Sequence, residues 1–347
     1  MIYKNIVINN SAFLEKALLK LSTNNLFKTL IVEDSSHKVI GTITDGDIRR
    51  GLISGLSNNN KISDFLPSNF VFLKKGFYDQ DKIKLIISKK IQIVPVLNDD
   101  RTLFKIIDFN KVKTILPIDA VIMAGGRGVR LLPLTKTTPK PMLKIGGKPI
   151  IENNLELLKI YGITQVTISV NYLKEKIKSH LKNGSKHNLK ISYVTESNSL
   201  GTIAGIKKIK FFYNDYVLVM NSDLLTSINL EQMYNELISN NGDIIVATKD
   251  YKVQIPYGVL ETIDNKIIAL KEKPLYTFFS NAGIYIFKKE LIDFIPKDTY
   301  FNATDFIEKL INENKKVLNY SIKNYWLDVG SHEDFLKAQE EISNFKL

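Results

Sequence analysis

The segment from Gly125 to Lys140 combines glycines with cations at a spacing suited to binding phosphate, in the order Gly125, Gly126, Arg127, Gly128, Arg130 and Lys140. It follows the apolar run 120–123, which predicts a buried strand. Glycines allow a sharp turn and a close approach of backbone N–H groups to an anion. Fixed positive charge on the same loop favours the binding of a polyphosphate group. The sequence therefore predicts a site for a nucleoside triphosphate.

Two other glycine motifs do not fit this segment. A dinucleotide-binding G-x-G-x-x-G would place its third glycine at Leu131 and continue into a helix. The prolines at 133, 139 and 141 exclude a regular helix here. A Walker-type loop fails because Gly147-Lys148 is followed by Pro149. The remaining alternative is an ordinary glycine turn with solvated charges.

The run Gly125-Gly-x-Gly-x-Arg-Leu-x-Pro-Leu-Thr135, followed by Pro139-Lys-Pro-Met142, resembles the signature of sugar-1-phosphate nucleotidyltransferases. The resemblance extends from about Asp119 to the C-terminus. It implies a Rossmann-like α/β domain that transfers a nucleoside monophosphate from an NTP to a sugar 1-phosphate, with release of pyrophosphate and use of Mg²⁺. In this interpretation Arg130 and Lys140 are catalytic.

Two aspartates are candidate metal ligands. Asp223 follows the apolar run 216–220, and Asp328 stands in Trp326-Leu-Asp-Val-Gly330. Magnesium typically takes one or two carboxylates together with substrate phosphates. The resemblance implies that Asp223 and Asp328 bind Mg²⁺, and that Asp223 is also catalytic. The alternatives are a helix N-cap for Asp223 and a turn residue for Asp328.

Substrate-binding residues are implied by the resemblance alone. Sugar hydroxyls would be held at Gly258, Glu272 and Asn281, with Lys273 neutralising the sugar phosphate; the loop with Glu196, Gly201 and Thr202 would read the base. The glutamine typical of thymidylyltransferases is missing there, and Leu200-Gly-Thr-x-Ala-Gly205 looks more like guanylyltransferases. We expect GTP and glucosamine 1-phosphate. Mannose 1-phosphate with GTP, and uridylyl or thymidylyl transfer, remain alternatives.

The reaction implied by the resemblance requires no strong general base, because the attacking group is already a phosphate oxygen. Catalysis would depend on positioning and on neutralising charge. Arg130 and the loop amides would hold the triphosphate, while Lys140 and Lys273 would hold the two reacting phosphates in line.

The first hundred residues contain a degenerate repeat, in which residues 29–44 align with residues 93–108. Each copy predicts two strands joined by a polar hairpin and preceded by a helix, at 12–21 and 79–88. This arrangement resembles a tandem CBS pair. Gly41, Thr44 and Asp47 fit the adenosine-nucleotide pattern of such domains, and the second copy has lost it. Either one nucleotide binds here, or the pair serves only packing or dimerisation.

The elements that must position these residues alternate between strand and helix from Asp119 onward. Strands are expected at 121, 165–170, 190–194, 216–220 and 243–248, and helices at 150–161, 173–181, 202–209, 230–239 and 333–342. Alternation predicts a mainly parallel sheet covered on both faces, with ligands at the carboxyl ends of its strands. We expect a CBS domain at 1–115 and a nucleotidyltransferase domain at 116–347.

Composition limits the other classes of function. The 347 residues have a formal charge of +12 and no cysteine, which excludes disulfides and thiolate metal sites. The lysines are spread along the chain, so nucleic acid is not an expected partner. No apolar run suggests a membrane span or signal peptide, so we expect a cytoplasmic protein. A homo-oligomer is expected by resemblance. The alternative of another class is an inactive, CBS-regulated binding protein.

Overall fold

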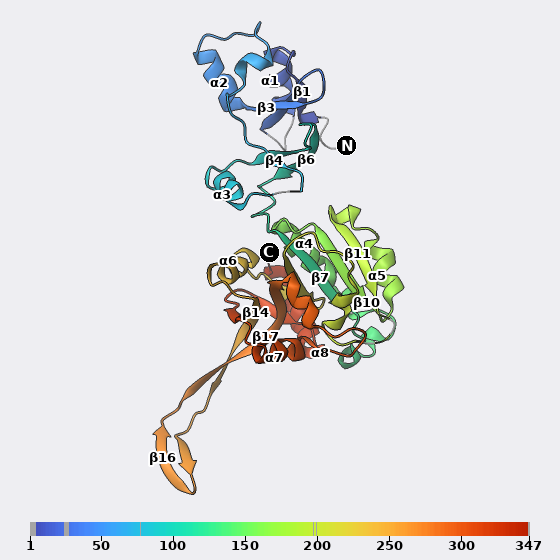
Figure 1. The fold of residues 1–347 in the computed structure, drawn as a ribbon, viewed down its shortest axis with the longest axis vertical. Helices are drawn as coiled ribbons and strands as arrows, with labels where there is room; N and C mark the ends of the chain where they lie inside the picture. Colours follow the sequence, from blue (N-terminus) through green and yellow to red (C-terminus); the bar gives the residue numbers. More distant parts are fainter. Residues whose placement is uncertain (1–4, 24–27, 77, 197, 199, 346–347) are drawn as a thin grey trace. The chain divides into compact units, whose positions relative to one another are not determined.

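The chain divides into two compact units, Met1–Ile115 and Leu116–Leu347. The structure is a computed structural model, which describes residues 5–23, 28–76, 78–196, 198 and 200–345. Figure 1 follows the chain through both units. Among the described residues, no helix has the length and apolar character needed to cross a membrane.

The first unit contains two three-stranded sheets with the same topology, β1-β2-β3 and β4-β5-β6. In each sheet the first pair is parallel and the second is an antiparallel hairpin. The elements are β1 (Val7–Asn9), α1 (Leu14–Thr23), β2 (Thr29–Glu33), β3 (Val39–Thr44), α2 (Asp45–Ile53), η2 (Ile62–Phe65), β4 (Leu73–Lys74), α3 (Gln80–Ser88), β5 (Ile93–Leu97) and β6 (Leu103–Asp108). The repeat seen in the sequence is thus a repeat of the fold, and its identity as a CBS pair stays a prediction.

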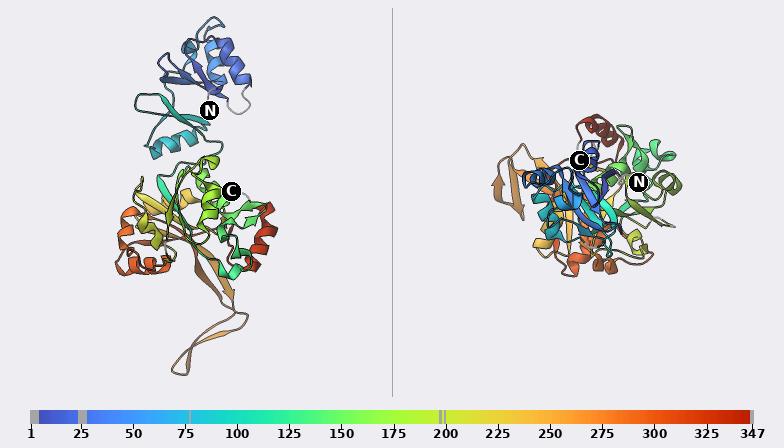
Figure 2. Two further views of the ribbon diagram at one scale, coloured as in Figure 1. Left: turned by 90° about the vertical axis from the view of Figure 1, so that its right-hand side faces the viewer. Right: turned by 90° about the horizontal axis from the view of Figure 1, so that it is seen from above.

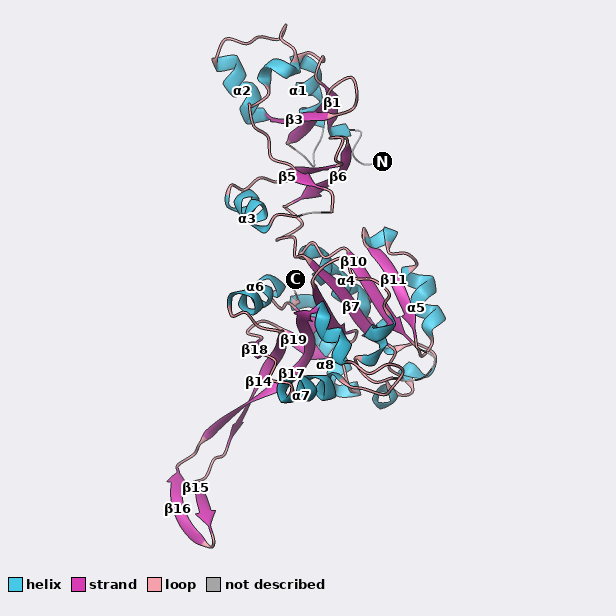
Figure 3. Cartoon of the chain, viewed as in Figure 1, coloured by secondary structure: helices cyan, strands magenta, loops and turns pink. Residues whose placement is uncertain are grey.

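The second unit is built on a seven-stranded sheet of order β11-β10-β7-β12-β17-β14-β18. β17 runs antiparallel to both of its neighbours, and the other neighbouring pairs are parallel. The strands are β7 (Ile118–Ala124), β10 (Gln165–Val170), β11 (Lys190–Thr195), β12 (Tyr216–Asn221), β14 (Ile244–Gln254), β17 (Leu275–Lys288) and β18 (Val317–Ser321). The expected mainly parallel α/β sheet is confirmed (Figure 3).

Helices cover both faces of this sheet because successive side chains of each strand point to opposite sides. In β7, Ile118, Ala120 and Ile122 belong to one buried cluster, whereas Val121 belongs to another. The helices are α4 (Ile150–Ile160), α5 (Lys174–Leu181), α6 (Leu230–Ser239), α7 (Ala303–Asn312) and α8 (His332–Glu341). Gly162, at φ +68°, takes the left-handed conformation expected just after α4.

Two regions differ from the sequence-based expectation. The helix expected over 202–209 is a 3₁₀ segment, η7 (Ala204–Lys208), preceded by a turn. The strand expected to end at Thr248 continues as β14 to Gln254 and pairs with the outer part of β17. We call residues 249–280 the ribbon; it projects from the sheet in both views (Figures 1 and 2) and includes β15 (Val259–Ile263) and β16 (Lys266–Lys271).

The remaining elements surround the carboxyl edge of the sheet or connect its helices. The proline-containing signature forms η3 (Val129–Leu131), η4 (Leu134–Lys136) and η5 (Lys140–Met142), all short 3₁₀ turns as its prolines require. The others are β8 (Lys144–Ile145), β9 (Lys148–Pro149), η6 (Ser185–His187), β13 (Leu224–Thr226), η8 (Lys289–Phe294), β19 (Trp326–Asp328) and η9 (Ile342–Asn344).

Candidate active site

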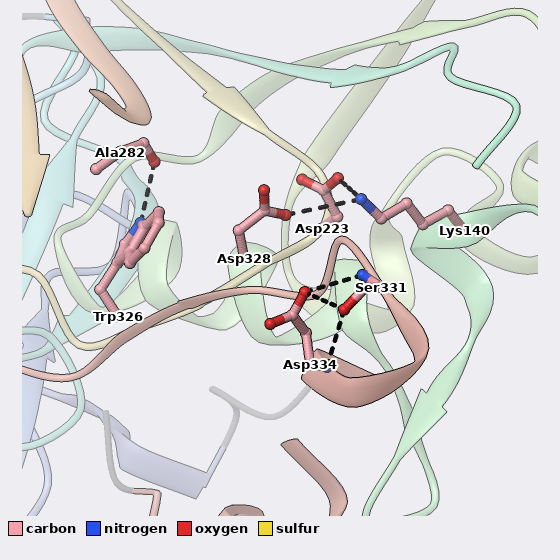
Figure 4. Close-up of polar contacts among 7 residues, drawn as sticks. All are labelled: Lys140, Asp223, Ala282, Trp326, Asp328, Ser331 and Asp334. Carbon is pink, nitrogen blue, oxygen red and sulfur yellow. Dashed lines mark hydrogen bonds and ion pairs between the residues drawn. The ribbon is translucent and has the colours of Figure 1, made fainter. Parts of the chain in front are cut away.

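Two short strands bring Asp223 and Asp328 together. Asp223 lies between β12 and β13, and β13 pairs antiparallel with β19 so that Leu224 stands opposite Asp328. The backbone N–H of Val329 donates to the carbonyl of Asp223 at 3.1 Å. Because β12 is a central strand, this pairing fixes both carboxylates at the carboxyl edge of the sheet (Figure 4).

Lys140 from η5 lies beside both carboxylates. Its Nζ forms an ion pair with Asp223 Oδ2 and lies 3.7 Å from Asp328 Oδ1. The lysine side chain is 12% exposed and that of Asp223 is 18% exposed, so water screens this pair only in part. Prolines at 139 and 141 restrict the backbone on either side of Lys140. The sequence prediction that Lys140, Asp223 and Asp328 belong to one site agrees with this geometry.

Burial and neighbouring charges act in opposite directions on Asp328. Burial raises the pKa of Asp328, and the neighbouring charge of Asp223 raises it further, whereas Lys140 and Arg130 lower it. Arg130, on η3, approaches from the signature loop: a Cβ at Gly330 would lie 3.1 Å from its Nη2. The structure therefore brings Arg130 to the same pocket.

The donor set fits a hard divalent cation. Asp223 Oδ1 and Asp328 Oδ1 are buried, and neither has a hydrogen-bond partner among the described residues. A buried carboxylate oxygen without a partner is costly, and a metal ion would satisfy both. The described residues contain no cluster of three or more His, Cys, Asp or Glu side chains for a complete protein cage. Two carboxylates plus substrate phosphates is the arrangement that Mg²⁺ favours.

The glycines of the signature occupy different environments. Gly128 has φ +63°, and a Cβ there would lie 3.0 Å from Thr135 Cγ2 and 3.1 Å from Lys140 Cβ. Its backbone conformation and its crowding both require glycine. Gly126 is open, with no atom within 4 Å of a Cβ placed there. At Gly125 a Cβ would meet Asn171 at 3.3 Å. The loop is therefore held at Gly128 and accessible at Gly126.

Glu196 is buried next to this loop, at the end of β11. Ser169 Oγ donates to its Oε1 at 2.5 Å, and the N–H of Leu200 donates to its Oε2 at 3.3 Å. A Cβ at Gly205 would lie 2.6 Å from both Glu196 Oε1 and Ser169 Oγ. Glu196 therefore contacts Ser169, Leu200 and Gly205 from within the fold, and a direct contact with the base remains a prediction. Ser169 was not among the predicted site residues, and its signal in the sequence is its place near the end of a predicted strand.

Gly201 and Thr202 lie against the start of α7. Gly201 has φ +90°, and a Cβ there would lie 2.5 Å from the carbonyl oxygen of Phe301. Thr202 Oγ1 accepts the N–H of Ala303 at 2.9 Å, and its own N–H donates to Asn302 Oδ1 at 3.3 Å. These contacts show a structural role for both residues, and their role in substrate binding stays a prediction.

The predicted sugar-binding residues lie on the ribbon and at its base. Gly258, Glu272 and Lys273 are exposed on the outer ribbon, where a Cβ at Gly258 would lie 3.2 Å from Glu272 Oε2. Asn281 stands at the base of the ribbon, and its Oδ1 accepts from Gly283 N and Tyr285 Oη, both at 2.9 Å. The three residues of the outer ribbon therefore lie away from Lys140, whereas Asn281 lies next to the buried part of β17.

Two further residues support the pocket. Trp326 Nε1 donates to the carbonyl of Ala282 at 3.0 Å, which joins β19 to β17 (Figure 4). His332 Nε2 lies 2.8 Å from the carbonyl oxygen of Leu132 and links α8 to the signature loop. His332 was not among the predicted site residues. Its position two residues after Gly330, at the start of a predicted helix, was the available signal.

The predicted nucleotide residues of the first unit also lie close together. Thr44 caps α2: its hydroxyl donates to Asp47 Oδ2 at 2.6 Å and accepts from Asp47 N at 3.3 Å. Both residues line a cavity of about 620 Å³, whose wall includes Lys89 and Lys90. Gly41 lies earlier in β3, where a Cβ would lie 2.8 Å from the side chain of Leu66. The capping contacts explain Thr44 and Asp47 structurally, and the cavity leaves room for a ligand.

Residues 119–344 match the family model described as nucleotidyl transferase. The chain is 32% identical over 257 residues to a UTP--glucose-1-phosphate uridylyltransferase of Synechocystis sp., covering 66% of this chain and 65% of that protein. It thus spans just under two thirds of that relative's length. It is also 32% identical over 231 residues to the D-glycero-alpha-D-manno-heptose 1-phosphate guanylyltransferase of Aneurinibacillus thermoaerophilus, covering 66% of this chain and 100% of that protein.

A crystal structure of HddC from Yersinia pseudotuberculosis has a similar fold, with a TM-score of 0.52 and 27% identity over 65% of this chain and 99% of that one. The same protein has been solved in complex with GMP-PN. The match to the family model begins in β7, before the signature loop, and includes β13, β19 and α8. This chain belongs to the nucleotidyl transferase family through residues 119–344.

Proposed function

We propose that residues 116–347 transfer a nucleoside monophosphate from an NTP to a sugar 1-phosphate and release pyrophosphate. The observation that supports this most directly is the pocket in which Lys140 lies between Asp223 and Asp328 beside an accessible glycine loop. The two carboxylate oxygens without hydrogen-bond partners are suited to a metal ion that also binds phosphate. Relatives named as guanylyl- and uridylyltransferases of sugar 1-phosphates are each 32% identical to this chain over 66% of its length.

In the proposed reaction an oxygen of the sugar phosphate attacks the α-phosphorus, and the bond between the α-phosphorus and the bridging oxygen to the β-phosphate breaks. The bond electrons leave with pyrophosphate, so no protein base is required. Asp223 and Asp328 would hold Mg²⁺, which neutralises charge on the phosphates when bound. Arg130 and the amides near Gly126 would hold the triphosphate, and Lys140 would lie against the reacting phosphate.

GTP and glucosamine 1-phosphate are our preferred substrates. The segment Leu200-Gly-Thr-x-Ala-Gly205 lacks the glutamine of thymidylyltransferases, and HddC, a structural relative, binds a guanine-nucleotide analogue. The order of domains in this chain, a predicted CBS pair followed by this domain, resembles that of the glucosamine-1-phosphate guanylyltransferases of bacterial legionaminic acid biosynthesis. Mannose or heptose 1-phosphate with GTP, and uridylyl or thymidylyl transfer, are the alternatives that the experiment must separate.

The test is pyrophosphate release from each of GTP, UTP, dTTP, CTP and ATP, with a panel of sugar 1-phosphates and Mg²⁺. We expect turnover that requires both substrates and is fastest with GTP. A preference of about tenfold or more for dTTP or UTP would overturn the base assignment. Pyrophosphate release with none of the pairs, while the protein still binds the NTP, would favour an inactive binding protein.

For the first unit we propose one adenosine-nucleotide site, formed at Thr44 and Asp47. The cavity of about 620 Å³ beside these residues has lysines at 89 and 90 in its wall, which suit a phosphate chain. Isothermal titration with AMP and ATP should give one site per chain that persists in the Asp223→Asn variant. The Thr44→Val variant, which cannot cap α2 or bind a ribose hydroxyl, should lose it.

A further inference from the structure

The segment that joins β10 to α5 and includes the first residues of that helix, 171–176, contacts the signature loop, residues 125–142. We call it the β10–α5 segment. Because β10 pairs in parallel with β7, this segment begins beside the first glycine of the loop. The N–H of Tyr172 donates to the carbonyl of Gly125 at 3.5 Å, and a Cβ at Gly125 would lie 3.3 Å from the Cβ of Asn171. The register of the sheet therefore places the segment against the loop.

Side chains of the β10–α5 segment reach three consecutive carbonyls of the signature loop. The hydroxyl oxygen of Tyr172 lies 3.0 Å from the carbonyl oxygens of both Thr135 and Lys136, and its single proton can be shared between them. The ammonium group of Lys176, in the first turn of α5, donates to the carbonyl of Thr137. The segment therefore supplies donors to the end of η4 and to the residue that follows it.

The signature loop needs donors from outside because of its prolines. The last carbonyls of a helical turn are normally satisfied by N–H groups three or four residues ahead. Four residues ahead of Thr135 is Pro139, which is also three residues ahead of Lys136. Four residues ahead of Thr137 is Pro141. Proline has no N–H to donate, so the side chains of the β10–α5 segment replace donors that the loop itself lacks.

The same contacts extend to the residues of the proposed reaction. Thr135 is fully buried, and its Oγ1 donates to the carbonyl of Gly128 at 2.8 Å. A Cβ at Gly128 would in turn lie 3.1 Å from the Cβ of Lys140, whose Nζ lies beside two carboxylates. A side chain that holds η4 in place therefore also helps to fix the separation between the glycine loop and Lys140.

The backbone of the β10–α5 segment adopts a costly conformation. Leu173, the residue before α5, has φ +47° and ψ +33°, in the left-handed region that a residue with a Cβ rarely adopts. Such a conformation persists where its surroundings hold it, and it is concentrated at functional sites. Here it lies between Tyr172 and Lys176, so the change of direction at Leu173 lets both side chains reach the same loop.

We propose that Tyr172 is a positioning residue for the nucleotidyl transfer, with Lys176 as a second donor to the same loop. The inference rests on the proposed function. The hydroxyl of Tyr172 contacts backbone carbonyls and not the reacting groups; it acts by holding η4, and through η4 it holds Gly128 and Lys140 where the triphosphate binds. A displacement of about 1 Å in such a site can lower a rate by about two orders of magnitude, so one hydrogen bond affects turnover more than stability.

Tyr172→Phe removes the hydroxyl and keeps the ring. We expect kcat for pyrophosphate release to fall about fivefold and the KM for the NTP to rise, with the KM for the sugar 1-phosphate unchanged, because the loop holds the triphosphate. Tyr193→Phe is the matched control, since its hydroxyl also donates to a backbone carbonyl, that of Lys182 at 2.7 Å, at the other end of α5. It should keep the wild-type kcat and KM, and the melting temperatures of both variants should stay within a few degrees of wild type.

Lys176→Met tests the second donor. It should lower kcat by about twofold, and Lys176→Arg, which retains a cationic donor, should restore the wild-type rate. Lys178→Met on the same helix is the control, because Lys178 Nζ donates to Thr195 Oγ1 at 3.2 Å and not to the signature loop.

A readout that does not depend on turnover is trypsin cleavage after Lys136, which is exposed and is followed by Thr137. A loop that has lost its contact with Tyr172 should be cut faster. We expect cleavage of Tyr172→Phe after Lys136 to be at least about threefold faster than that of wild type and of Tyr193→Phe, with the cut located by mass spectrometry.

The outcomes separate the inference from the proposed function. If Tyr172→Phe matches Tyr193→Phe in turnover, the inference is wrong even where cleavage is faster, because the contact then serves structure alone. Equal rates of cleavage after Lys136 in these two variants would also overturn it. If Tyr172→Phe is cut faster as expected but the wild-type protein releases no pyrophosphate from any substrate pair, the contact between segment and loop is correct and the proposed reaction is not.

Discussion

Replacing Asp223 by Asn tests the assignment of the metal site most directly. The substitution keeps the size of the side chain and removes one of the two anionic ligands. In a partly screened site, opposite charges about 4 Å apart interact by about 4 kcal/mol at an effective dielectric constant near 20. Only a minor part of this interaction is expected to be present equally in the ground state. We expect about 3 kcal/mol of lost transition-state stabilisation, a decrease in kcat on the order of 10²-fold.

The fold should survive this substitution. Lys140 keeps a partner because Asp328 Oδ1 lies 3.7 Å from its Nζ, and the carbonyl of residue 223 still accepts the N–H of Val329. The unfolding midpoint should therefore change by only a few degrees, on the scale expected for about 1 kcal/mol. Asp215→Asn is the matched control, since this aspartate is 84% exposed and precedes β12 at the other edge of the sheet.

The assay is pyrophosphate release as a function of Mg²⁺ concentration, repeated with Mn²⁺. A weakened metal site should regain part of its activity at high Mg²⁺ or with Mn²⁺, whereas a lost general base should not. Near-wild-type turnover of both Asp223→Asn and Asp328→Asn would refute the assignment. So would a loss that neither metal relieves in a protein that remains folded.

Three further predictions concern other parts of the chain. Gly128→Ala should lower the free energy of unfolding by about 1–2 kcal/mol in urea titrations, because φ is +63° and the new Cβ would be crowded, whereas Gly126→Ala should have little effect on stability. The hydrogen bond and charge of Lys288 hold the pKa of Asp243 below its usual range, so this carboxylate stabilises the fold above pH ~4 and less as the pH falls through its lowered pKa. The difference in melting temperature between wild type and Asp243→Asn should therefore shrink between about pH 6 and pH 3. Calorimetry with adenosine nucleotides should give one site per chain outside the catalytic pocket, and two equivalent sites would contradict the assignment at Thr44.

Elements with a clear local pattern were predicted well from the sequence. The strand over 165–170 and the helix over 230–239 have the expected bounds, because their apolar residues repeat at strand and helix periods over a sufficient length. The prolines of the signature correctly excluded an α-helix across that segment. The grouping of Lys140, Asp223 and Asp328 was predicted by resemblance to a family, and the structure agrees with it.

Features set by long-range pairing could not be predicted. β13 and β19 have three residues each, too few to show a period, and their pairing joins segments about a hundred residues apart in the chain. β17 passes from the buried segment near Ile284 to the exposed segment near Phe278 without a break in strand character, so its pattern does not show where the sheet ends. Glu196 was expected to face substrate, and its contact with Ser169 depends on how β10 and β11 align.

The pairing of β13 with β19 also determines at which stage of folding the pocket forms. Asp328 joins Asp223 across a closure of about a hundred residues, whose entropic cost is met only when the intervening segments have folded. During synthesis, a chain that has been made as far as Asp223 already has its glycine loop and Lys140, yet holds only one of the two carboxylates. In the finished protein the same short pairing is a weak point, because β19 contributes three residues to a two-stranded sheet. Fraying of β19 would therefore dismantle the site while the seven-stranded sheet stayed intact, and the active fraction would follow local opening instead of global unfolding.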